Sequence, residues 1–444
     1  MLSNNNSYIM NIKQVMNNQP VINIGMIGHV SNGKSTIVKS LTGKATQKHS
    51  DEKERNITIK LGYANAKIYK CNSCESPDNY ASTASNIFQL NCKHCESEME
   101  LVNHVSFTDC PGHFFLMATM LNGTCVMDYT ILVESLNNDI IPAPQTIEHV
   151  KATTLTNTPN KIICINKLDL IKRPEAEKKL NIFQKYASNT ILKDSAIIPI
   201  AASLGLNMDV LCEELAKLEI PNRKINVPQR MIIIRSFNAN KPGTNIKDLK
   251  GGIIGGSLLD GMIKINDNVI LKPGIIIPNE KYDENNCENT KWNYKPIQSQ
   301  IISIHSENNK LEQAIPGGLI GVQLDIDPSI SSDDGLIGNV MVTLDNEQDF
   351  EVFEDIEIEF IPFTNDELCL KKNDKVFVNA NANNRSCSIF KFKKNKMILK
   401  LLTSPICIKK GDTVTISINT TEGEGITIIG KGIILDGNSS TLIL

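Results

Sequence analysis

The sequence predicts an α/β domain with a mostly parallel sheet, followed by two β-barrel domains. In the first half of the chain, apolar runs typical of strands alternate with helical patterns, and this alternation favours a parallel sheet with helices on both faces. After Arg230 the pattern changes to short alternating runs punctuated by glycines, and a second β-rich block begins near residue 345. Short strands with glycine turns are typical of closed or nearly closed barrels. We therefore expect domains at residues 21–225, 226–343 and 344–444.

Five apolar runs of the first domain are expected to form strands, and each is followed by an expected helix. The expected strands are Val21–Ile27, Val105–Thr108, Tyr129–Val133, Lys161–Ile165 and Ile197–Ile200. The expected helices are Ser35–Leu41, Phe115–Leu121, Pro144–Thr153, Pro174–Tyr186 and Met208–Leu218. The segment "IPNRKINVPQR" carries two prolines and several charges, and it is predicted to link this domain to the first barrel. Residues 1–20 are rich in asparagine and lack the apolar core of a signal peptide, so we expect a disordered tail.

Size and composition indicate a soluble protein of several domains. The chain of 444 residues is too long for one ordinary domain, and its 41% hydrophobic residues can form a large core. No run is long and apolar enough to span a membrane. The net charge of −3 argues against indiscriminate binding of nucleic acid, so any RNA contact requires a local basic patch. Most of the twelve cysteines lie singly in apolar runs, which is typical of a reducing compartment, and we expect a cytoplasmic location.

The stretch "IGHVSNGKST" predicts a phosphate-binding loop. It fits the pattern G-x-x-x-x-G-K-[ST], and it lies between an expected strand and an expected helix, which is the context that distinguishes this motif from a chance glycine-rich turn. The glycines allow backbone N–H groups to surround an anion at a helix N-terminus. We expect Lys34 to neutralise the β- and γ-phosphates and Ser35 to bind Mg²⁺. The nucleotide-contacting residues of this loop are predicted to be Ser31, Asn32, Gly33, Lys34, Ser35 and Thr36.

A second motif indicates that the base is guanine. In "CINKLD", Asn166, Lys167 and Asp169 follow an apolar strand. A carboxylate at Asp169 can accept hydrogen bonds from N1–H and the 2-amino group of guanine, and adenine lacks this donor pair. The alternative is that Asp169 only caps a helix. A third guanine loop is expected at "PIAASLG", with the base facing the backbone of Ala201, Ala202 and Ser203.

The stretch "SFTDCPGH" predicts the segment that senses the γ-phosphate. Asp109, at a strand end, is expected to hold the water shell of Mg²⁺. The backbone N–H of Gly112 can meet the γ-phosphate, and His113 is placed to orient an attacking water. Phosphoryl transfer of this kind depends mainly on positioning and charge stabilisation. The alternative for His113 is an ordinary surface imidazole.

Four cysteines in the first domain predict a structural zinc site. Cys71, Cys74, Cys92 and Cys95 form C-x2-C-x17-C-x2-C, which suits a closed tetrahedral Zn²⁺ site. The segment between the pairs is polar, and we expect the metal to order it. Free surface thiols or two redox pairs are the alternatives. His94 lies inside the second pair and is expected to be exposed rather than a ligand.

A resemblance to a known family rests on six segments: "ERNITIKLGYANAKIYKC", "HVSFTDCPGHFFLMATMLNG", "PQTIEHV", "RSFNANKPGT", "DLKGGIIGGSLLDG" and "IPGGLIGVQLDIDPSI". Together they resemble the gamma subunit of eukaryotic and archaeal translation initiation factor two, over roughly Val21 to Asp345. The resemblance implies a GTPase domain followed by two barrels, as in elongation factor Tu. It also implies that Thr58 is a second ligand of Mg²⁺, that Asn56 and Tyr63 belong to the switch and the site for the aminoacyl end of tRNA, and that residues 70–99 form a zinc knuckle.

The resemblance further implies partners and an activity. Members of the family assemble with alpha and beta subunits and deliver methionyl initiator tRNA to the small ribosomal subunit in the GTP state. We therefore expect a GTPase with slow intrinsic hydrolysis, because no catalytic arginine is evident in the loops. A GTPase-activating factor and a nucleotide-exchange factor are expected partners, and a membrane is not.

Three residues depart from the family pattern. Ala201 replaces a serine of the third guanine loop, Phe114 replaces an aspartate, and Ala143 replaces a glutamine. The C-terminal ending lacks the family's basic, tryptophan-bearing sequence, so any contact of the last barrel with tRNA is expected to be weaker or different. Three other functions remain open from the sequence: an elongation factor, including the selenocysteine-specific kind, a stand-alone GTP hydrolase, and a scaffold that uses GTP structurally.

Overall fold

The computed structural model describes residues 12–46, 58, 61–113, 116–156, 158–282, 290–363, 370–419 and 426–443. The chain forms two compact units. Unit 1 comprises Met1–Asn222, His305–Leu311 and Gly317–Leu319, and unit 2 comprises Arg223–Ile304, Glu312–Pro316 and Ile320–Leu444.

Unit 1 contains a seven-stranded sheet in the order β3-β2-β4-β1-β5-β6-β7. The strands are β1 (Ile22–Ile27), β2 (Gly62–Lys70), β3 (Tyr80–Ala84), β4 (Glu100–Asp109), β5 (Tyr129–Ser135), β6 (Asn160–Asn166) and β7 (Ala196–Pro199). Strand β1 pairs in parallel with β4 and β5, and the parallel ladder continues through β6 to β7. The predicted mostly parallel sheet is therefore confirmed. The antiparallel pair β2 and β3 was not predicted, because their polar residues do not form an apolar run.

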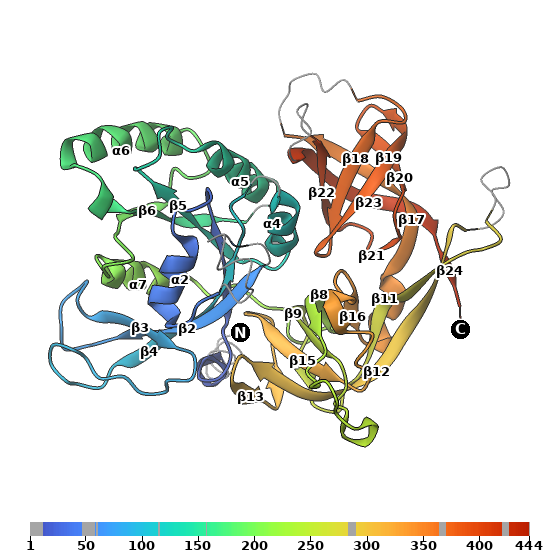
Figure 1. The fold of residues 1–444 in the computed structure, drawn as a ribbon, viewed down its shortest axis with the longest axis horizontal. Helices are drawn as coiled ribbons and strands as arrows, with labels where there is room; N and C mark the ends of the chain where they lie inside the picture. Colours follow the sequence, from blue (N-terminus) through green and yellow to red (C-terminus); the bar gives the residue numbers. More distant parts are fainter. Residues whose placement is uncertain are drawn as a thin grey trace, which may run out of the picture. The chain divides into compact units, whose positions relative to one another are not determined.

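Helices cover both faces of this sheet, as predicted (Figure 1). The helices are α2 (Lys34–Thr42), α4 (Met117–Thr124), α5 (Pro144–Leu155), α6 (Arg173–Ser188) and α7 (Met208–Ala216). Ile37 of α2 and Leu211 of α7 join β1 in one apolar core. All six residues of β1 are buried, as is typical of a central strand covered on both faces.

Part of the predicted N-terminal tail belongs to this core. Residues 12–16 are helical, and Ile12 and Met16 are buried with the residues of β1. The Met16 carbonyl accepts a hydrogen bond from the Nδ1 of buried His104 at 2.7 Å. The expectation of a disordered tail is therefore wrong for residues 12–20, because Ile12, Val15 and Met16 lie at helical spacing and supply one apolar packing face. Residues 1–11 lie outside the described residues.

Unit 2 contains the two predicted barrels. The strands of the first are β8 (Arg230–Phe237), β9 (Ile253–Asp260), β11 (Asn268–Pro278), β12 (Trp292–Ser306), β15 (Ile320–Leu324) and β16 (Val340–Val342). Its strand order closes on itself because β11 pairs with both β16 and β12. The short strands β10 (Ile263–Lys264) and β14 (Gln313–Ala314) pair beside it.

The second barrel closes in the same way, since β17 pairs with β20 as well as with β23 and β21. Its strands are β17 (Glu351–Pro362), β18 (Lys375–Ala380), β19 (Asn383–Lys393), β20 (Lys396–Leu401), β21 (Ile406–Ile408), β22 (Thr413–Asn419) and β23 (Ile426–Ser439). The last strand, β24 (Thr441–Leu442), returns to pair with β12 of the first barrel.

One hairpin departs from the simple order of domains along the chain. Strand β13 (Asn309–Leu311) and the turn before it follow β12, yet they belong to unit 1. The Glu307 carboxylate accepts a hydrogen bond from the backbone N–H of Asn65 at 2.7 Å and pairs with Lys44. The expected boundaries at 225/226 and 343/344 remain predictions, but a division by sequence position alone assigns this hairpin to the barrel.

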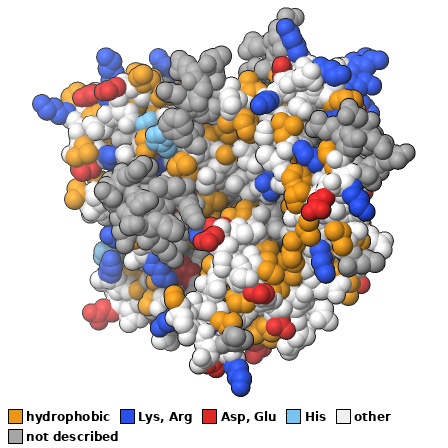
Figure 2. Space-filling view, turned by 45° about the vertical axis from the view of Figure 1, so that its right-hand side comes forward, with side chains coloured by type: hydrophobic (Ala, Val, Ile, Leu, Met, Phe, Trp, Pro, Cys, Tyr) orange, Lys and Arg blue, Asp and Glu red, His pale blue; other side chains and the backbone are white. Residues whose placement is uncertain are grey.

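The surface and the helices agree with the composition. On the face drawn in Figure 2, acidic and basic side chains are interspersed, in keeping with a net charge of only −3. In the described part of the chain, no helix has the length and apolar character needed to cross a membrane.

Candidate nucleotide site and cysteine cluster

The loop between β1 and α2 requires glycine at both ends of its motif. Gly28 has φ 131° and Gly33 has φ 95°, which is backbone that favours glycine. A Cβ on Gly28 would lie 2.2 Å from the carbonyl oxygen of Val133, and one on Gly33 would lie 2.2 Å from the Nδ2 of Asn166. The loop is therefore packed tightly against the ends of β5 and β6.

Lys34 is held at the centre of this loop. Its side chain is buried, and its Nζ donates to the carbonyls of Gly28 and His29, both at 2.9 Å. Burial lowers the pKa of Lys34 to about 8, and the nearby Asp109 carboxylate opposes this shift. The cation is thus placed by the loop's own backbone.

A cavity of about 400 Å³ brings the predicted phosphate and magnesium residues together. Ser31, Gly33, Lys34, Ser35, Thr36, Thr58, Gly112 and Lys167 are among the residues that line it. The hydroxyl oxygens of Ser35 and Thr58 lie 3.2 Å apart, although 23 residues separate them in the chain. Oxygen atoms are the ligands that Mg²⁺ prefers, so this pair fits the metal that the fold implies.

The segment that follows β4 reaches the same cavity. A Cβ on Gly112 would lie 2.5 Å from the Nζ of Lys34. Asp109, at the end of β4, is fully buried, and its carboxylate accepts a hydrogen bond from the hydroxyl of Thr46 at 2.5 Å. His113 is half-buried and directly follows Gly112. The pKa of the neighbouring His29 is lowered mainly by the burial of its own imidazole, and the positive charges of Lys34 and His113 also lower it. His113 is therefore close to the phosphate loop and not remote on the surface.

Asn166 connects the phosphate loop to the third guanine loop. Its Nδ2 donates to the carbonyl of Asn32 at 2.9 Å, and its Oδ1 accepts from the N–H of Ala202 at 3.1 Å. Lys167 has φ 63° and lines the cavity. Asp169 is exposed within the short helix η2 (Leu168–Leu170). The N-caps of the neighbouring helices are Lys167 and Lys172, so Asp169 is not a helix N-cap, and its contact with a base stays a prediction.

The loop that begins at Ala201 is closed by its backbone. The Ala201 carbonyl accepts from the N–H groups of Leu204 and Leu206, at 3.0 and 3.2 Å. Ala201 and Ala202 are buried, and Ser203 is exposed. The missing serine hydroxyl is therefore not needed to close this turn.

The structure says less about the residues that the family resemblance singled out near the switch. Tyr63 is half-buried on β2, opposite Thr108 of β4. Asn56 and the departure at Phe114 lie outside the described residues.

His149 is a residue of the site that the sequence analysis missed. It lies on α5, fully buried, and its Nδ1 accepts a hydrogen bond from the backbone N–H of Gly28 at 2.8 Å. Burial lowers its pKa to about 3, so the imidazole is neutral and able to accept. A histidine on the apolar face of a helix gives no signal by itself, because only the fold brings α5 to the loop.

Glu134 is a second residue that was missed. It is fully buried at the end of β5, and its carboxylate accepts from the side chains of Asn32 and Asn138 and from the backbone N–H groups of Ser135 and Ala143. An acidic residue inside the apolar run "ILVES" was a usable signal. Because only the backbone of Ala143 is used, the departure from glutamine does not affect this contact.

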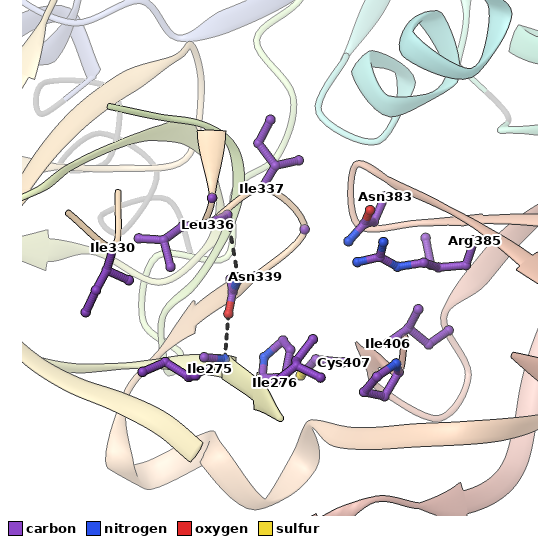
Figure 3. Close-up of a pocket in the computed structure, with 16 residues that line it drawn as sticks. Ile275, Ile276, Ile330, Leu336, Ile337, Asn339, Asn383, Arg385, Ile406 and Cys407 are labelled. Atoms are coloured by element: carbon purple, nitrogen blue, oxygen red, sulfur yellow. Dashed lines mark hydrogen bonds between the residues drawn. The ribbon is translucent and has the colours of Figure 1, made fainter. Parts of the chain in front are cut away.

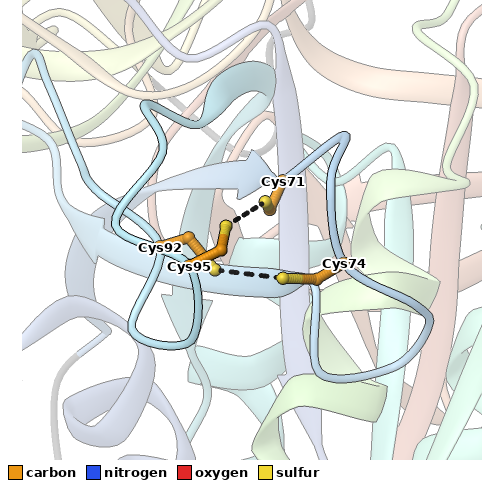
Figure 4. Close-up of side chains that lie close together, drawn as sticks. All are labelled: Cys71, Cys74, Cys92 and Cys95. Carbon is orange, nitrogen blue, oxygen red and sulfur yellow. Dashed lines mark hydrogen bonds between the residues drawn. The ribbon is translucent and has the colours of Figure 1, made fainter.

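The four predicted zinc ligands converge in the structure (Figure 4). The Sγ atoms of Cys71 and Cys95 lie 3.5 Å apart, and those of Cys74 and Cys92 lie 3.7 Å apart. All four sulfurs lie within 4.8 Å of one another. A tetrahedral zinc with Zn–S bonds of about 2.3 Å places its sulfurs about 3.8 Å apart, so the cluster fits this metal. His94 is exposed, as predicted.

The segment between the cysteine pairs is more ordered than predicted. It contains β3, which pairs with β2, and the hydroxyl of Ser76 donates to the Glu213 carboxylate of α7 at 2.7 Å. Sheet pairing therefore contributes to the structure of this segment, and the expectation that a metal orders it stays a prediction.

Comparisons with known proteins support one family. Residues 19–221 match the family model described as the elongation factor Tu GTP binding domain. The chain is 39% identical to eukaryotic translation initiation factor 2 subunit 3 of Drosophila melanogaster, over 97% of the chain and 92% of that protein. It is 41% identical to eukaryotic translation initiation factor 2 subunit gamma of Schizosaccharomyces pombe, over 91% of each.

Solved structures show the same fold at lower identity. The bacterial selenocysteine-specific elongation factor EF-Sec aligns with a TM-score of 0.67 and 18% identity, over 94% of this chain and 58% of that one. The elongation factor SelB of Methanococcus maripaludis, in complex with a GTP analogue, aligns with a TM-score of 0.68 and 19% identity, over 94% and 80%. This likeness concerns the arrangement of one α/β domain and two barrels.

Proposed function

Because the chain belongs to the gamma-subunit family of translation initiation factor 2 and is a GTPase of translation initiation, we propose that it binds methionyl initiator tRNA in the GTP state. It delivers this tRNA to the small ribosomal subunit and releases it after hydrolysis of GTP to GDP and phosphate. The observation that carries this proposal is the meeting of Ser35, Thr58 and Gly112 at one cavity. These residues come from three separate segments, so a ligand at this cavity can hold all three together.

Different residues of the site would bind the phosphates, the magnesium ion and the base. Lys34 offsets the negative charge of the β- and γ-phosphates, and the N–H groups of the loop donate to their oxygens. Ser35 and Thr58 would hold Mg²⁺ through their hydroxyls, with Asp109 orienting its water shell. Mg²⁺ supplies positive charge at the phosphate oxygens. Asn166, Lys167 and Asp169 select guanine, supported by the backbone of Ala201, Ala202 and Ser203.

Hydrolysis depends on positioning. Gly112 donates its N–H to the γ-phosphate, and His113 orients the attacking water. No arginine is among the residues that line the cavity in the described part of the chain, and this supports slow intrinsic turnover that a GTPase-activating partner accelerates. Loss of the γ-phosphate removes the contacts that hold Thr58 and Gly112. The two segments that carry these residues would then change from an ordered to a released state, and this change is the switch.

The remaining assignments of this proposal are drawn from the family. Tyr63, on the strand that leads away from the switch, contacts the aminoacyl end of the tRNA together with Asn56. The chain assembles with alpha and beta subunits, and a nucleotide-exchange factor replaces GDP. None of the ten described cysteines forms a disulfide, which supports the reducing environment of the cytoplasm.

The test of the main proposal is filter binding of methionyl initiator tRNA to the purified chain with Mg²⁺ and either GTP or GDP. We expect at least about tenfold tighter binding with GTP, a difference of about 1.4 kcal/mol. Equal affinity in the two states would defeat the carrier function and favour a hydrolase or scaffold. Uncharged initiator tRNA serves as the control for recognition of the aminoacyl end.

We further propose that Cys71, Cys74, Cys92 and Cys95 hold a structural Zn²⁺. Chelation is expected to make residues 70–99, which include β3, more sensitive to protease, while the parallel strands β4, β1, β5, β6 and β7 keep their resistance, because their pairing does not involve this segment. The variant Cys92→Ser is expected to give the same result without chelator, and Cys125→Ser, outside the cluster, is the matched control. Unchanged protease sensitivity of the segment after metal removal would contradict the zinc assignment.

A further inference from the structure

A second cavity lies within unit 2, between the two barrels (Figure 3). Its volume is about 310 Å³, at the lower end of the range of small ligand sites, which is roughly 300–1,000 Å³. Polar and apolar atoms contribute about equally to its walls. The apolar part includes four isoleucines: Ile275 and Ile276 come from β11, Ile337 from the loop before β16, and Ile406 from β21. The residues come from four separate stretches of the chain, so no motif marks this place.

Arg385, on β19, is the charged residue of this lining. Its Nε is buried without a hydrogen-bond partner, and burial lowers the pKa of its guanidinium. Two other arginines of unit 2 have carboxylate partners: Arg230 pairs with Asp412 at 2.6 Å, and Arg235 pairs with Asp334 at 2.9 Å. Among the described residues, no carboxylate pairs with Arg385. The Arg385 side chain as a whole is half-buried, and an anion that meets this partly desolvated cation offsets the cost of its lost hydration.

A second donor lies next to this cation. Figure 3 shows the side chains of Asn383 and Arg385 side by side, facing the same open space. Asn339, by contrast, is already occupied, since its side chain donates to the carbonyl of Leu336 and accepts from the N–H of Gly274. The Asn383 amide packs over Gly338, where φ is 82° and a Cβ would lie 2.1 Å from the Asn383 Nδ2. The cavity thus combines an apolar wall with one corner of N–H donors.

We propose that this cavity binds a carboxylate group of a partner polypeptide at Arg385 and Asn383, with an adjacent apolar side chain against the isoleucine wall. A guanidinium matches a carboxylate through two parallel hydrogen bonds. The apolar wall favours a side chain that leaves water on binding. A nucleic acid is disfavoured, because phosphate backbones are bound by several cations, and Arg385 is the one cationic side chain among the described residues that line this cavity.

The test uses the full chain labelled with ¹⁵N at the arginine Nε, since six arginines give few and separable Nε–H signals. Two probes carry the carboxylate differently: N-acetyl-Leu-Leu has it at the C-terminus, and N-acetyl-Leu-Asp-amide has it on a side chain. N-acetyl-Leu-Leu-amide lacks it, and inorganic phosphate supplies an anion without an apolar group. We expect a saturable shift of the Arg385 signal with at least one carboxylate probe, at a dissociation constant of roughly 1 mM.

Variants separate the two parts of the cavity. Arg385→Gln removes one Nε–H signal and so identifies the signal of Arg385, whereas Ile337→Ser leaves that signal observable and is expected to weaken binding of the carboxylate probe by about tenfold. Lys372→Gln removes an exposed charge of the same barrel and serves as the control. The proposal is overturned if neither carboxylate probe shifts the Arg385 signal, if the uncharged amide binds equally well, or if inorganic phosphate binds more tightly than both carboxylates.

Discussion

The nucleotide cavity and the cavity between the barrels are similar in size, and each contains a partly or fully buried cation. They differ in how that cation is satisfied. Lys34 donates to two backbone carbonyls of its own loop, whereas the Nε of Arg385 has no hydrogen-bond partner. In the nucleotide cavity, the chain itself supplies the hydrogen-bond partners that hold the cation in place. The half-buried guanidinium of Arg385, by contrast, has no carboxylate partner among the described residues, and this is the basis for proposing a ligand from outside the chain.

The largest expected effect concerns the tight packing of the phosphate loop. Gly28→Ala places a Cβ 2.2 Å from a backbone carbonyl at φ 131°, and we expect a loss of roughly 3 kcal/mol in the free energy of unfolding together with loss of GTP binding. Gly43→Ala is the matched control, because φ there is also positive, at 70°, but nothing lies within 4 Å of the added Cβ. Urea unfolding measures both, and an equal effect of the two variants would show that the loop is not tightly packed.

The next effect comes from buried neutral histidines of unit 1. The pKa values of His104 and His149 are each lowered by burial from 6.5 to about 3. The unfolded chain therefore binds protons at these residues below pH 6.5, and the folded chain binds them only near pH 3. Their stabilisation is complete above pH 6.5 and is lost as the pH falls towards 3.

At pH 5 the expected loss is roughly 2 kcal/mol for each histidine, measured as the urea midpoint of unit 1 against pH. His104→Gln is expected to flatten this dependence. His94→Gln is the control, because it removes an exposed histidine of the same unit. A pH profile that is flat between 6.5 and 5 in the unaltered chain would contradict the burial of both imidazoles in neutral form.

A smaller effect tests how His149 acts on the phosphate loop. In His149→Leu the N–H of Gly28 loses its acceptor, and we expect about tenfold weaker GDP binding, or about 1.4 kcal/mol. In His149→Asn the side-chain oxygen can accept in place of Nδ1, and affinity is expected to return to within about threefold of the unaltered chain. Fluorescent-nucleotide titration measures this, and a failure of asparagine to improve on leucine would assign His149 a purely packing role.

The sequence allowed prediction where a structure or site depends on residues that lie close together in the chain. The strand, loop and helix around "GHVSNGKST", the cysteine pairs and the closed barrels could all be predicted, because periodicity and motif spacing are local properties. The pairing of Ser35 with Thr58 was anticipated only through family resemblance, since the distance between two hydroxyls depends on the fold.

What could not be predicted depends on contacts between distant segments. His149 meets Gly28 across 121 residues, and the N–H group of Ala143 that donates to Glu134 is placed by a turn that the sequence does not mark. Residues 12–16 contribute to the core although their neighbours are polar. The hairpin at Glu307 belongs to unit 1 because its carboxylate meets Asn65, and no local pattern announces such a contact.

The central claim is that Thr58 and Ser35, meeting at the nucleotide cavity, make RNA binding depend on the γ-phosphate. The most direct measurement is the ratio of initiator tRNA affinities with GTP and with GDP, in the unaltered chain and in Thr58→Ala. Thr190→Ala, which alters a half-buried threonine in the turn after α6 of the same unit, is the control. We predict a ratio of at least about ten that falls to about one in Thr58→Ala and is unchanged in the control. A ratio in Thr58→Ala as large as in the unaltered chain would contradict the claim.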